Sequence, residues 1–220
     1  MIERILEPEV MDDPQEAEEY DSMDFTEVNT DFALLASKLG DKSFKKVLDL
    51  GTGTARIPII LASFRPQWQI VAVDLAASML AIAERNIRAA GKSSQIILQL
   101  ADAKNLPYPD NSFDIIISNS LVHHIPNPLD LFQEINRLVK PTGGILIRDL
   151  VRPNCEAEID KIVAEANLDY TPRQKQLFRN SLYAALTVDE IKSLAAGVGW
   201  HNAEIYQSSP RHWTLLCSLS

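Results

Sequence analysis

A glycine loop and a distant aspartate are the first residues in the chain whose spacing suits ligand binding. Gly51-Thr52-Gly53 follows a short apolar run, and Asp74 ends the next such run, 21 residues after Gly53. Glycines let the backbone turn tightly and bring N–H groups close to a ligand at a helix N-terminus. A carboxylate at the end of the second strand can accept two hydrogen bonds from a ribose diol. A two-glycine loop alone is also typical of a plain tight turn, but the loop and the acid together predict a nucleoside cofactor.

Two histidines and three arginines are further candidates for chemistry. His123 and His124 follow one apolar run, and Arg148 and Arg152 stand at the end of another. Such strand ends form the rim where open α/β sheets bind ligands. Either histidine could take a proton or hold a substrate near neutral pH, and the arginines could clamp a carboxylate or phosphate. Alternatively, the histidines are packed loop residues and the strand-end arginines form ion pairs of the scaffold. Arg179 lies in a later helical stretch, and its alternative is a solvated surface side chain.

The elements that must position these residues alternate between strand and helix. Predicted strands cover 46–50, 69–73, 95–100, 113–118 and 145–150, with helices at 57–64, 78–90 and 128–139. This alternation predicts parallel strands with right-handed crossovers and helices on both faces. Helical stretches follow at 154–168, 172–185 and 187–197, and then two strands at 203–207 and 213–218. Their short connection favours an antiparallel hairpin. The predicted fold is therefore an α/β, doubly wound (Rossmann-like), mostly parallel seven-stranded sheet with a C-terminal antiparallel hairpin.

Capping residues mark several helix starts. Asp13 before Pro14 and Asn127 before Pro128 are each placed to cap a helix. Thr187, with Glu190 three residues later, has the spacing of a capping box.

The acidity of the chain is concentrated near its N-terminus. The formal charge is −9, from 21 Lys and Arg against 30 Asp and Glu. Residues 1–31 hold twelve of the acids and one base, which leaves 18 acids and 20 bases in residues 32–220. We expect residues 1–40 to form an acidic helical extension, which either caps the site or is a solvated helix pinned by Phe25 and Phe32. Residues 41–220 would form the main domain, with a helical insert at about 154–197.

Composition also disfavours several classes of protein. An acidic chain is unlike a general nucleic-acid binder, and no apolar run approaches the ~20 residues that span a bilayer. The N-terminus lacks the basic start and apolar stretch of a secretory signal. Cys155 and Cys217 stand alone, which favours a reduced, cytoplasmic setting without a metal cluster. We expect no metal, no membrane and no nucleic-acid partner, and a monomer or homodimer.

Two cofactor classes use a glycine loop of this kind. Dinucleotide enzymes expect a third glycine at the position of Arg56, whose side chain would crowd the packing around a pyrophosphate. From about residue 45 to 150 the chain instead resembles the class I S-adenosylmethionine-dependent methyltransferases. Six segments carry the resemblance in order: 47–54, Val73-Asp74, Ala101-Asp102-Ala103, 109–114, 118–124 and 138–144, the last with Thr142 inserted. The terminal hairpin also resembles the end of that family's sheet.

The resemblance implies S-adenosyl-L-methionine as cofactor and a set of residues that contact it. The implied contacts are Asp49, Gly51, Thr52, Gly53, Asp74, Leu75, Met79, Asp102, Ala103, Asn119 and Ser120, together with Tyr20 from the extension. Because a sulfonium methyl is already activated, the expected mechanism is in-line displacement with mainly positional catalysis.

Missing motifs favour a small-molecule acceptor, with protein substrates left open. The chain lacks the Asn/Asp-Pro-Pro-aromatic segment of amino-group methylases and the nucleophilic cysteine of cytosine methylases. His123 and His124 are the expected catalytic residues. Arg148, Arg152 and Arg179 are the expected substrate contacts, which suggests an anionic acceptor. An NAD(P)-dependent oxidoreductase and a non-catalytic binder of S-adenosylmethionine or S-adenosylhomocysteine are the alternatives.

Overall fold

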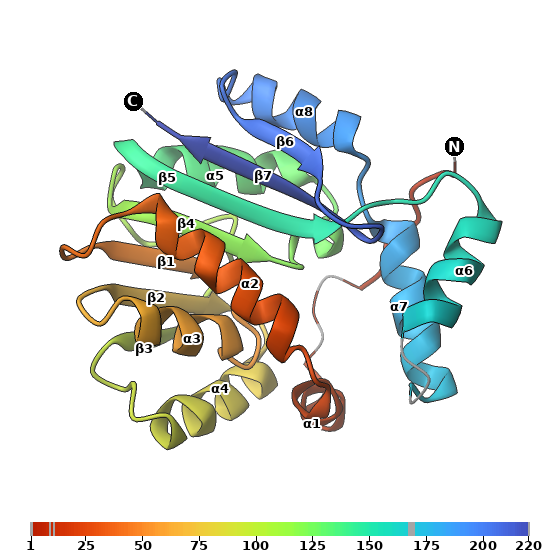
Figure 1. Cartoon of the computed structure of the whole chain (residues 1–220), viewed down its shortest axis with the longest axis horizontal. Coiled ribbons are helices and arrows are strands. Elements are labelled where there is room, and N and C mark those ends of the chain that lie inside the picture. Colours follow the sequence, from red (N-terminus) through yellow and green to blue (C-terminus); the bar gives the residue numbers. More distant parts are fainter. Residues whose placement is uncertain (1, 9, 11, 167–169, 220) are drawn as a thin grey trace.

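A seven-stranded sheet runs through the centre of the molecule (Figure 1). The computed structural model describes residues 2–8, 10, 12–166 and 170–219. The strands are β1 (Lys46–Leu50), β2 (Gln69–Asp74), β3 (Ile96–Leu100), β4 (Phe113–Asn119), β5 (Val139–Leu150), β6 (Glu204–Gln207) and β7 (His212–Ser218). Their order is β3-β2-β1-β4-β5-β7-β6. The first five are parallel, whereas β7 is antiparallel to both β5 and β6. The predicted fold and its terminal hairpin are therefore confirmed.

Helices cover both faces of the sheet and the end where the parallel strands finish. They are α1 (Pro14–Ser22), α2 (Thr26–Ala36), α3 (Arg56–Phe64), α4 (Ala77–Ala89), α5 (Pro128–Leu138), α6 (Glu156–Ala166), α7 (Pro172–Ala184) and α8 (Val188–Gly197). Short 3-10 turns, η1 (Ser37–Leu39) and η2 (Val122–His124), follow α2 and β4. In Figure 1, α2 and α3 lie in front of the sheet and α5 lies behind it. Helices α1, α6 and α7 stand beyond the carboxyl ends of the strands. The strand order reverses between β1 and β4, which is where such sheets bind ligands.

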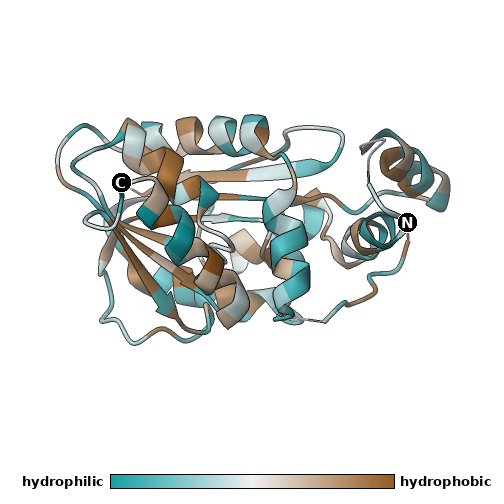
Figure 2. Ribbon diagram, turned by 90° about the horizontal axis from the view of Figure 1, so that it is seen from below, coloured by the Kyte–Doolittle hydropathy of each residue, from teal (hydrophilic) through white to brown (hydrophobic). Residues whose placement is uncertain are grey.

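Two apolar cores, one on each face, hold the sheet. On β4, Ile115 and Ile117 face the core that contains Phe32, whereas Ile116 between them faces the core that contains Phe132. Figure 2 shows the strands as mainly apolar ribbons between helices of mixed hydropathy. A sheet buried on both faces explains why its strands are continuous apolar runs in the sequence.

Strand β5 begins six residues earlier than the predicted 145–150, at Val139. The pairing of β4 with β5 shifts register between Phe113 and Ile115, and this irregularity accommodates Pro141 and the glycines after it. A side chain on Gly143 would lie 2.6 Å from Val139 Cγ2 and 2.8 Å from the Asp114 carbonyl oxygen. These glycines therefore allow close strand packing instead of ending the helix as a loop.

The predicted caps are confirmed at two helices and wrong at one. Asp13 Oδ1 accepts hydrogen bonds from the N–H groups of Gln15 and Glu16, both at 2.9 Å. Thr187 and Glu190 form the capping box of α8. Asn127 stands at the N-cap position of α5 but its side chain makes no cap bond; its amide nitrogen donates to Asp130 Oδ1 at 2.9 Å.

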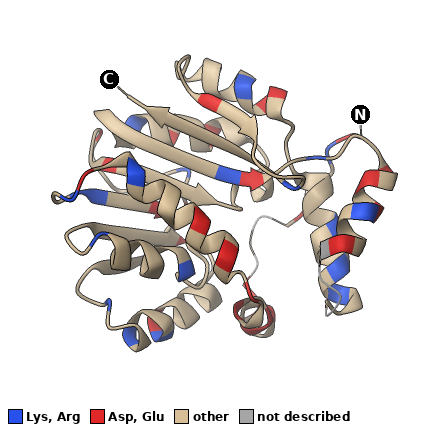
Figure 3. Cartoon of the chain, viewed as in Figure 1, with Lys and Arg blue, Asp and Glu red and all other residues tan. Residues whose placement is uncertain are grey.

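The acidic N-terminal segment is held by bases of the main sheet layer. Glu18 forms a two-pronged pair with Arg85 at 2.9 and 3.0 Å, and Asp21 pairs with Arg56 at 2.8 Å. Figure 3 colours acidic residues on α1 and α2 and basic residues on α7. Phe32 of α2 is fully buried in the core of the sheet, so α2 shares that core, and the boundary at residue 40 stays a prediction. In the described part of the chain, no helix is long and apolar enough to cross a membrane.

Candidate functional site

A cleft of about 1350 Å³ opens at the carboxyl ends of the parallel strands. Its walls come from the glycine loop, the ends of β2 and β4, helices α1, α2 and α7, and the turn between β6 and β7. All twelve residues predicted to bind the cofactor line it: Tyr20, Asp49, Gly51, Thr52, Gly53, Asp74, Leu75, Met79, Asp102, Ala103, Asn119 and Ser120. The structure thus brings the predicted set together, while their contacts with a cofactor stay a prediction.

The glycine loop needs its glycines for two separate reasons. Gly51 and Gly53 have φ of +70° and +54°, a backbone conformation that favours glycine. A Cβ on Gly51 would also lie 2.9 Å from Leu121 Cδ1, on the segment after β4. The N–H groups of Gly51 and Thr52 donate to the Val73 carbonyl at 3.0 and 2.9 Å. The loop is therefore tied to the end of β2 and packed closely against the end of β4.

Asp74 connects this loop to the second strand. Its Oδ2 accepts the Gly53 N–H at 2.7 Å, and its Oδ1 accepts the Ala76 N–H at 2.9 Å. Burial raises the pKa of this carboxyl above its ordinary value. The carboxylate faces the cleft with lone pairs left for further donors, as a ribose diol requires.

Asp49, at the end of β1, is a buried acid with a free acceptor. The residue is 2% exposed, and its Oδ2 has no hydrogen-bond partner among the described residues. Burial raises the pKa of the carboxyl to about 7. Because a buried acceptor without a partner is costly, this oxygen is suited to a cationic group of a bound ligand.

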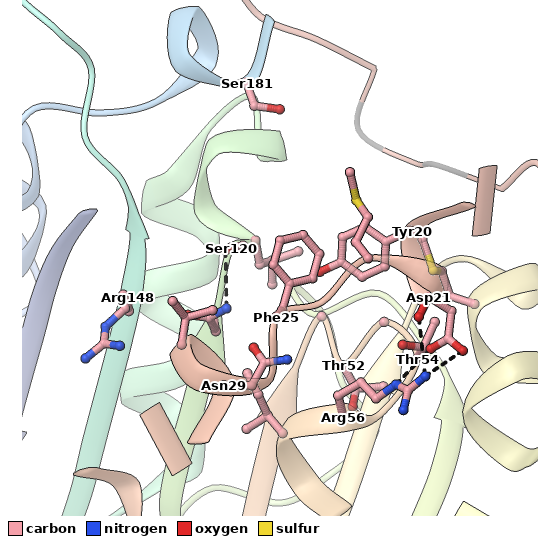
Figure 4. Close-up of a pocket in the computed structure, with 18 of the residues that line it drawn as sticks. Tyr20, Asp21, Phe25, Asn29, Thr52, Thr54, Arg56, Ser120, Arg148 and Ser181 are labelled. Atoms are coloured by element: carbon pink, nitrogen blue, oxygen red, sulfur yellow. Dashed lines mark hydrogen bonds and ion pairs between the residues drawn. The ribbon is translucent and has the colours of Figure 1, made fainter. Parts of the chain in front are cut away.

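Side chains from the N-terminal helices lie over the glycine loop. Tyr20 and Phe25 form an aromatic pair with ring centroids 5.4 Å apart, and both line the cleft (Figure 4). Burial and the nearby charge of Asp74 raise the pKa of the Tyr20 phenol to about 12, so it stays a neutral donor. Arg56, the departure from the dinucleotide pattern, pairs with Asp21 of α1 and fastens the extension beside the loop.

The two histidines lie at the other end of the cleft and meet two acids. His123 is buried, and its Nδ1 lies 2.5 Å from Asp149 Oδ1. Its Nε2 lies 3.4 Å from Glu7 Oε1, which is also 3.2 Å from Nδ1 of His124. Burial opposes the charged form of His123, but Asp149 outweighs it and raises the pKa. Burial lowers the pKa of His124 to about 3, and burial raises that of Glu7.

The three predicted substrate arginines lie in different places. Arg148 lines the cleft at its rim, where its Nε donates to Thr214 Oγ1 at 3.2 Å and its guanidinium turns away from Tyr20 and Phe25 (Figure 4). Arg152 is buried outside the cleft lining, with Ala185 and Glu190 as partners at 3.0 and 2.6 Å. Arg179 also lies outside the lining and pairs with Asp160. Glu190 and Asp160 already pair with these two guanidinium groups, and their contact with a substrate stays a prediction.

The cleft also contains or adjoins two residues that the sequence analysis missed. Arg211, in the turn between β6 and β7, lines the cleft, stacks over the Phe178 ring at 5.9 Å and donates to the Glu165 carbonyl at 3.1 Å. Glu7, near the N-terminus, contacts the two histidines, which lie near the middle of the sequence. No spacing in the sequence relates Glu7 to His123, so only the folded chain reveals this contact.

Comparison with known proteins gives consistent matches. Residues 41–200 match a family model described as "Methyltransferase domain". A demethylmenaquinone methyltransferase of Lactobacillus johnsonii is 33% identical over 123 residues, which cover 56% of this chain and 49% of that protein. This chain therefore spans about half the length of that relative.

Solved structures show the same fold. A SAM-dependent methyltransferase from Aquifex aeolicus superposes with a TM-score of 0.68 at 17% identity, covering 94% of this chain and 99% of that one. A phosphoethanolamine N-methyltransferase 2 from Haemonchus contortus, in complex with phosphomonomethylethanolamine and S-adenosylhomocysteine, gives 0.67 at 18% identity, covering 86% and 52%.

Proposed function

Since the chain belongs to the methyltransferase domain family, we propose that it is a class I S-adenosylmethionine-dependent methyltransferase that transfers a methyl group to a small-molecule acceptor. Its methyl donor is S-adenosyl-L-methionine. The observation that carries the proposal is the size of the cleft, about 1350 Å³. Pockets for one small ligand usually measure ~300–1,000 Å³, so this cleft has room for a nucleoside cofactor and a second molecule.

The residues around the cleft divide it into a cofactor end and an acceptor end. In our proposal Asp74 accepts the ribose hydroxyls, Asp102 and Ala103 contact the adenine, and Asp49 attracts the cationic methionine end. Tyr20 covers that end from α1. Ser181 on α7 stands across the cleft from Arg56 (Figure 4), so the acceptor enters between α7 and the segment after β4.

The proposed catalysis is positional. A lone pair on the acceptor forms the new bond to the methyl carbon as the C–S bond breaks, and the electron pair of that bond stays on sulfur. Aligning the two reactants can supply ~7–11 kcal/mol of the barrier. Helices α1 and α7, which are joined by an ion pair between Glu16 and Arg173, limit water access to the reacting atoms. His123 and His124, at the acceptor end, are proposed to contact the acceptor.

We propose an acceptor with both an apolar part and an anionic group. Leu177, Phe178 and Tyr170 give the acceptor end an apolar wall, and Arg211 gives it a positive charge. Two similar proteins offer one example of each feature. One is named for demethylmenaquinone, an apolar molecule, and another was solved with phosphomonomethylethanolamine, which carries an anionic phosphate. Arg211 favours the anionic class, because guanidinium groups bind carboxylate and phosphate with two parallel hydrogen bonds.

A labelled-methyl transfer screen tests the proposal. The protein is incubated with methyl-labelled S-adenosylmethionine and small-molecule fractions separated by charge, and we expect labelled product from an anionic fraction. Arg211→Gln should raise KM for that acceptor about tenfold or more, since a charged hydrogen bond contributes ~1.5–3 kcal/mol. Arg88→Gln is the matched control, because Arg88 lies outside the cleft and pairs with Glu84.

Other outcomes would contradict the proposal. Binding of S-adenosylhomocysteine without methyl transfer to any fraction would indicate a non-catalytic binder. A thermal shift with NAD and none with S-adenosylmethionine would indicate an oxidoreductase. Product from neutral fractions alone, with Arg211→Gln unaffected, would exclude the anionic acceptor.

A further inference from the structure

Glu7, His123 and His124 bring three metal-binding side chains together beside the acceptor end of the cleft. One ligand atom from each lies within 4.8 Å of the other two. The histidines belong to η2 after β4, and Glu7 belongs to the segment that precedes α1. Arg4 anchors that segment, since its guanidinium donates to the carbonyl groups of His123 and Ile125 at 3.2 and 2.9 Å.

Two of these side chains are held from behind by a second group. Asp149 accepts from the Nδ1 side of His123 at 2.5 Å and from its backbone N–H at 3.1 Å, which leaves Nε2 directed toward Glu7. The Ser181 hydroxyl lies 3.1 and 3.2 Å from the two carboxylate oxygens of Glu7. Metal-binding histidines commonly have their other ring nitrogen held by a carboxylate in this way, which fixes the tautomer and the ring orientation.

The close contact between His124 and Glu7 is not a hydrogen bond. Nδ1 of His124 is a buried atom with no hydrogen-bond partner among the described residues, although Glu7 Oε1 lies only 3.2 Å away. A nitrogen and an oxygen that lie this close without a hydrogen bond between them are placed as two ligands of one ion could be.

Two of the three separations between ligand atoms agree with a divalent ion, and the third lies within 4.8 Å. Metal–nitrogen bonds of ~2.0–2.1 Å and metal–oxygen bonds of ~2.0–2.2 Å place tetrahedral ligands about 3.3–3.5 Å apart. The separations from Glu7 Oε1 to the two imidazole nitrogens are 3.4 and 3.2 Å. Two imidazoles and one carboxylate suit zinc, iron or cobalt, whereas magnesium and calcium prefer all-oxygen ligands. We propose that Glu7, His123 and His124 form a site for a divalent transition-metal ion, with Asp149 and Ser181 as its supporting shell.

The site would leave a coordination position for the acceptor. Three protein ligands are typical of metal sites that keep an open position, and His123, His124 and Ser181 all line the cleft. The open position therefore faces the acceptor end, where an oxygen or sulfur atom of the acceptor would be the fourth ligand. This last step rests on the proposed methyl transfer, whereas the metal site itself does not.

Metal titration of the full chain tests the site directly. After chelator treatment the protein is titrated with Co²⁺ and Zn²⁺, with Co²⁺ visible absorption, calorimetry and thermal melting as readouts. We expect one ion per chain, a tetrahedral cobalt spectrum and a rise in Tm. Glu7→Gln and His124→Gln should each weaken binding at least tenfold, and Ser181→Ala about tenfold, the usual effect of losing a supporting group. Glu3→Gln and His201→Gln change exposed residues of the same types and should bind as wild type does.

The result that overturns the site is no stoichiometric binding, or equal binding by wild type, Glu7→Gln and His124→Gln. Either result would leave the cluster as an ion pair of Glu7 with His123. Weakening by Glu3→Gln or His201→Gln to the same degree would instead place the ion on the surface and also overturn it. Binding of S-adenosylhomocysteine is measured in chelator on the same samples. A protein that binds the nucleoside but no metal contradicts only this inference, and one that binds metal but no nucleoside contradicts only the proposed function.

Discussion

Replacing Asp49 by Asn should stabilise the cofactor-free protein in a pH-dependent way. The carboxyl is 2% exposed, its Oδ2 lacks a partner among the described residues, and burial raises its pKa to about 7. In the unfolded chain the pKa is about 3.9. Because the folded value is the higher one, the stability that this group contributes is fully present below pH ~3.9 and is lost as the pH rises through about 7. The full loss is about 4 kcal/mol at ~1.36 kcal/mol per pKa unit.

The measurement is urea unfolding of both proteins at two pH values. At about pH 5.5 the wild type has lost roughly 2 kcal/mol through Asp49, and at about pH 8 roughly 4 kcal/mol. Asparagine carries no charge, so its advantage over wild type should grow by about 2 kcal/mol between them. For a chain of this length that equals a further gain in Tm of about 4–8 °C. Apart from Asp74, whose charge acts on Asp49, the other titrating groups are common to both proteins and should largely cancel.

A constant difference between the two proteins across this pH range would refute the reasoning, since Asp49 would then be ionised throughout. Asp114→Asn is the matched control, because Asp114 is paired with Lys140 at 2.7 Å and its replacement should destabilise the protein.

The Asp49 variant should also bind S-adenosylmethionine about 10–150-fold more weakly, because it loses a charged hydrogen bond of ~1.5–3 kcal/mol to the cofactor. Unchanged affinity would remove Asp49 from the cofactor site.

Three further substitutions separate binding from scaffolding. Asp74→Ala should raise the Kd for S-adenosylhomocysteine at least about tenfold in calorimetry, because the ribose loses a charged acceptor; an unaltered Kd would place the ribose elsewhere. Gly51→Ala should cost about 1–3 kcal/mol in denaturant unfolding, because φ is +70° and the new Cβ would approach Leu121 at 2.9 Å; a neutral result would mean that the loop relaxes. Arg152→Ala should cost about 1.5–3 kcal/mol by removing its charged hydrogen bonds to Glu190 and to the Ala185 carbonyl, while the folded protein keeps its cofactor affinity. The opposite pattern would return Arg152 to the substrate site.

Local patterns in the sequence were sufficient for the strands and for most of the cofactor end. The apolar runs predict β1 to β4 closely, because a sheet buried on both faces needs continuous apolar strands. Gly51, Gly53 and Asp74 could be recognised because parallel strands bring their carboxyl ends to one edge, so residues at strand ends meet whatever their separation along the chain. The start of β5 was not predictable, since Pro141 and the glycines after it are tolerated only at the irregular pairing with β4.

Tertiary structure alone decided which charged side chains are free to act. Arg148 and Arg152 both follow the same predicted strand, but Glu190 already pairs with Arg152, and Asp160 pairs with Arg179 of the helical stretch. Glu7 reaches His123 only because Arg4 fastens the N-terminal segment across the loop after β4. Sequence spacing determines contacts within a helix, a strand or a strand end. The ion-pair partners that distant segments bring to a charged side chain depend on how those segments pack. The charged side chains that are left without such a partner are the ones available to bind a ligand.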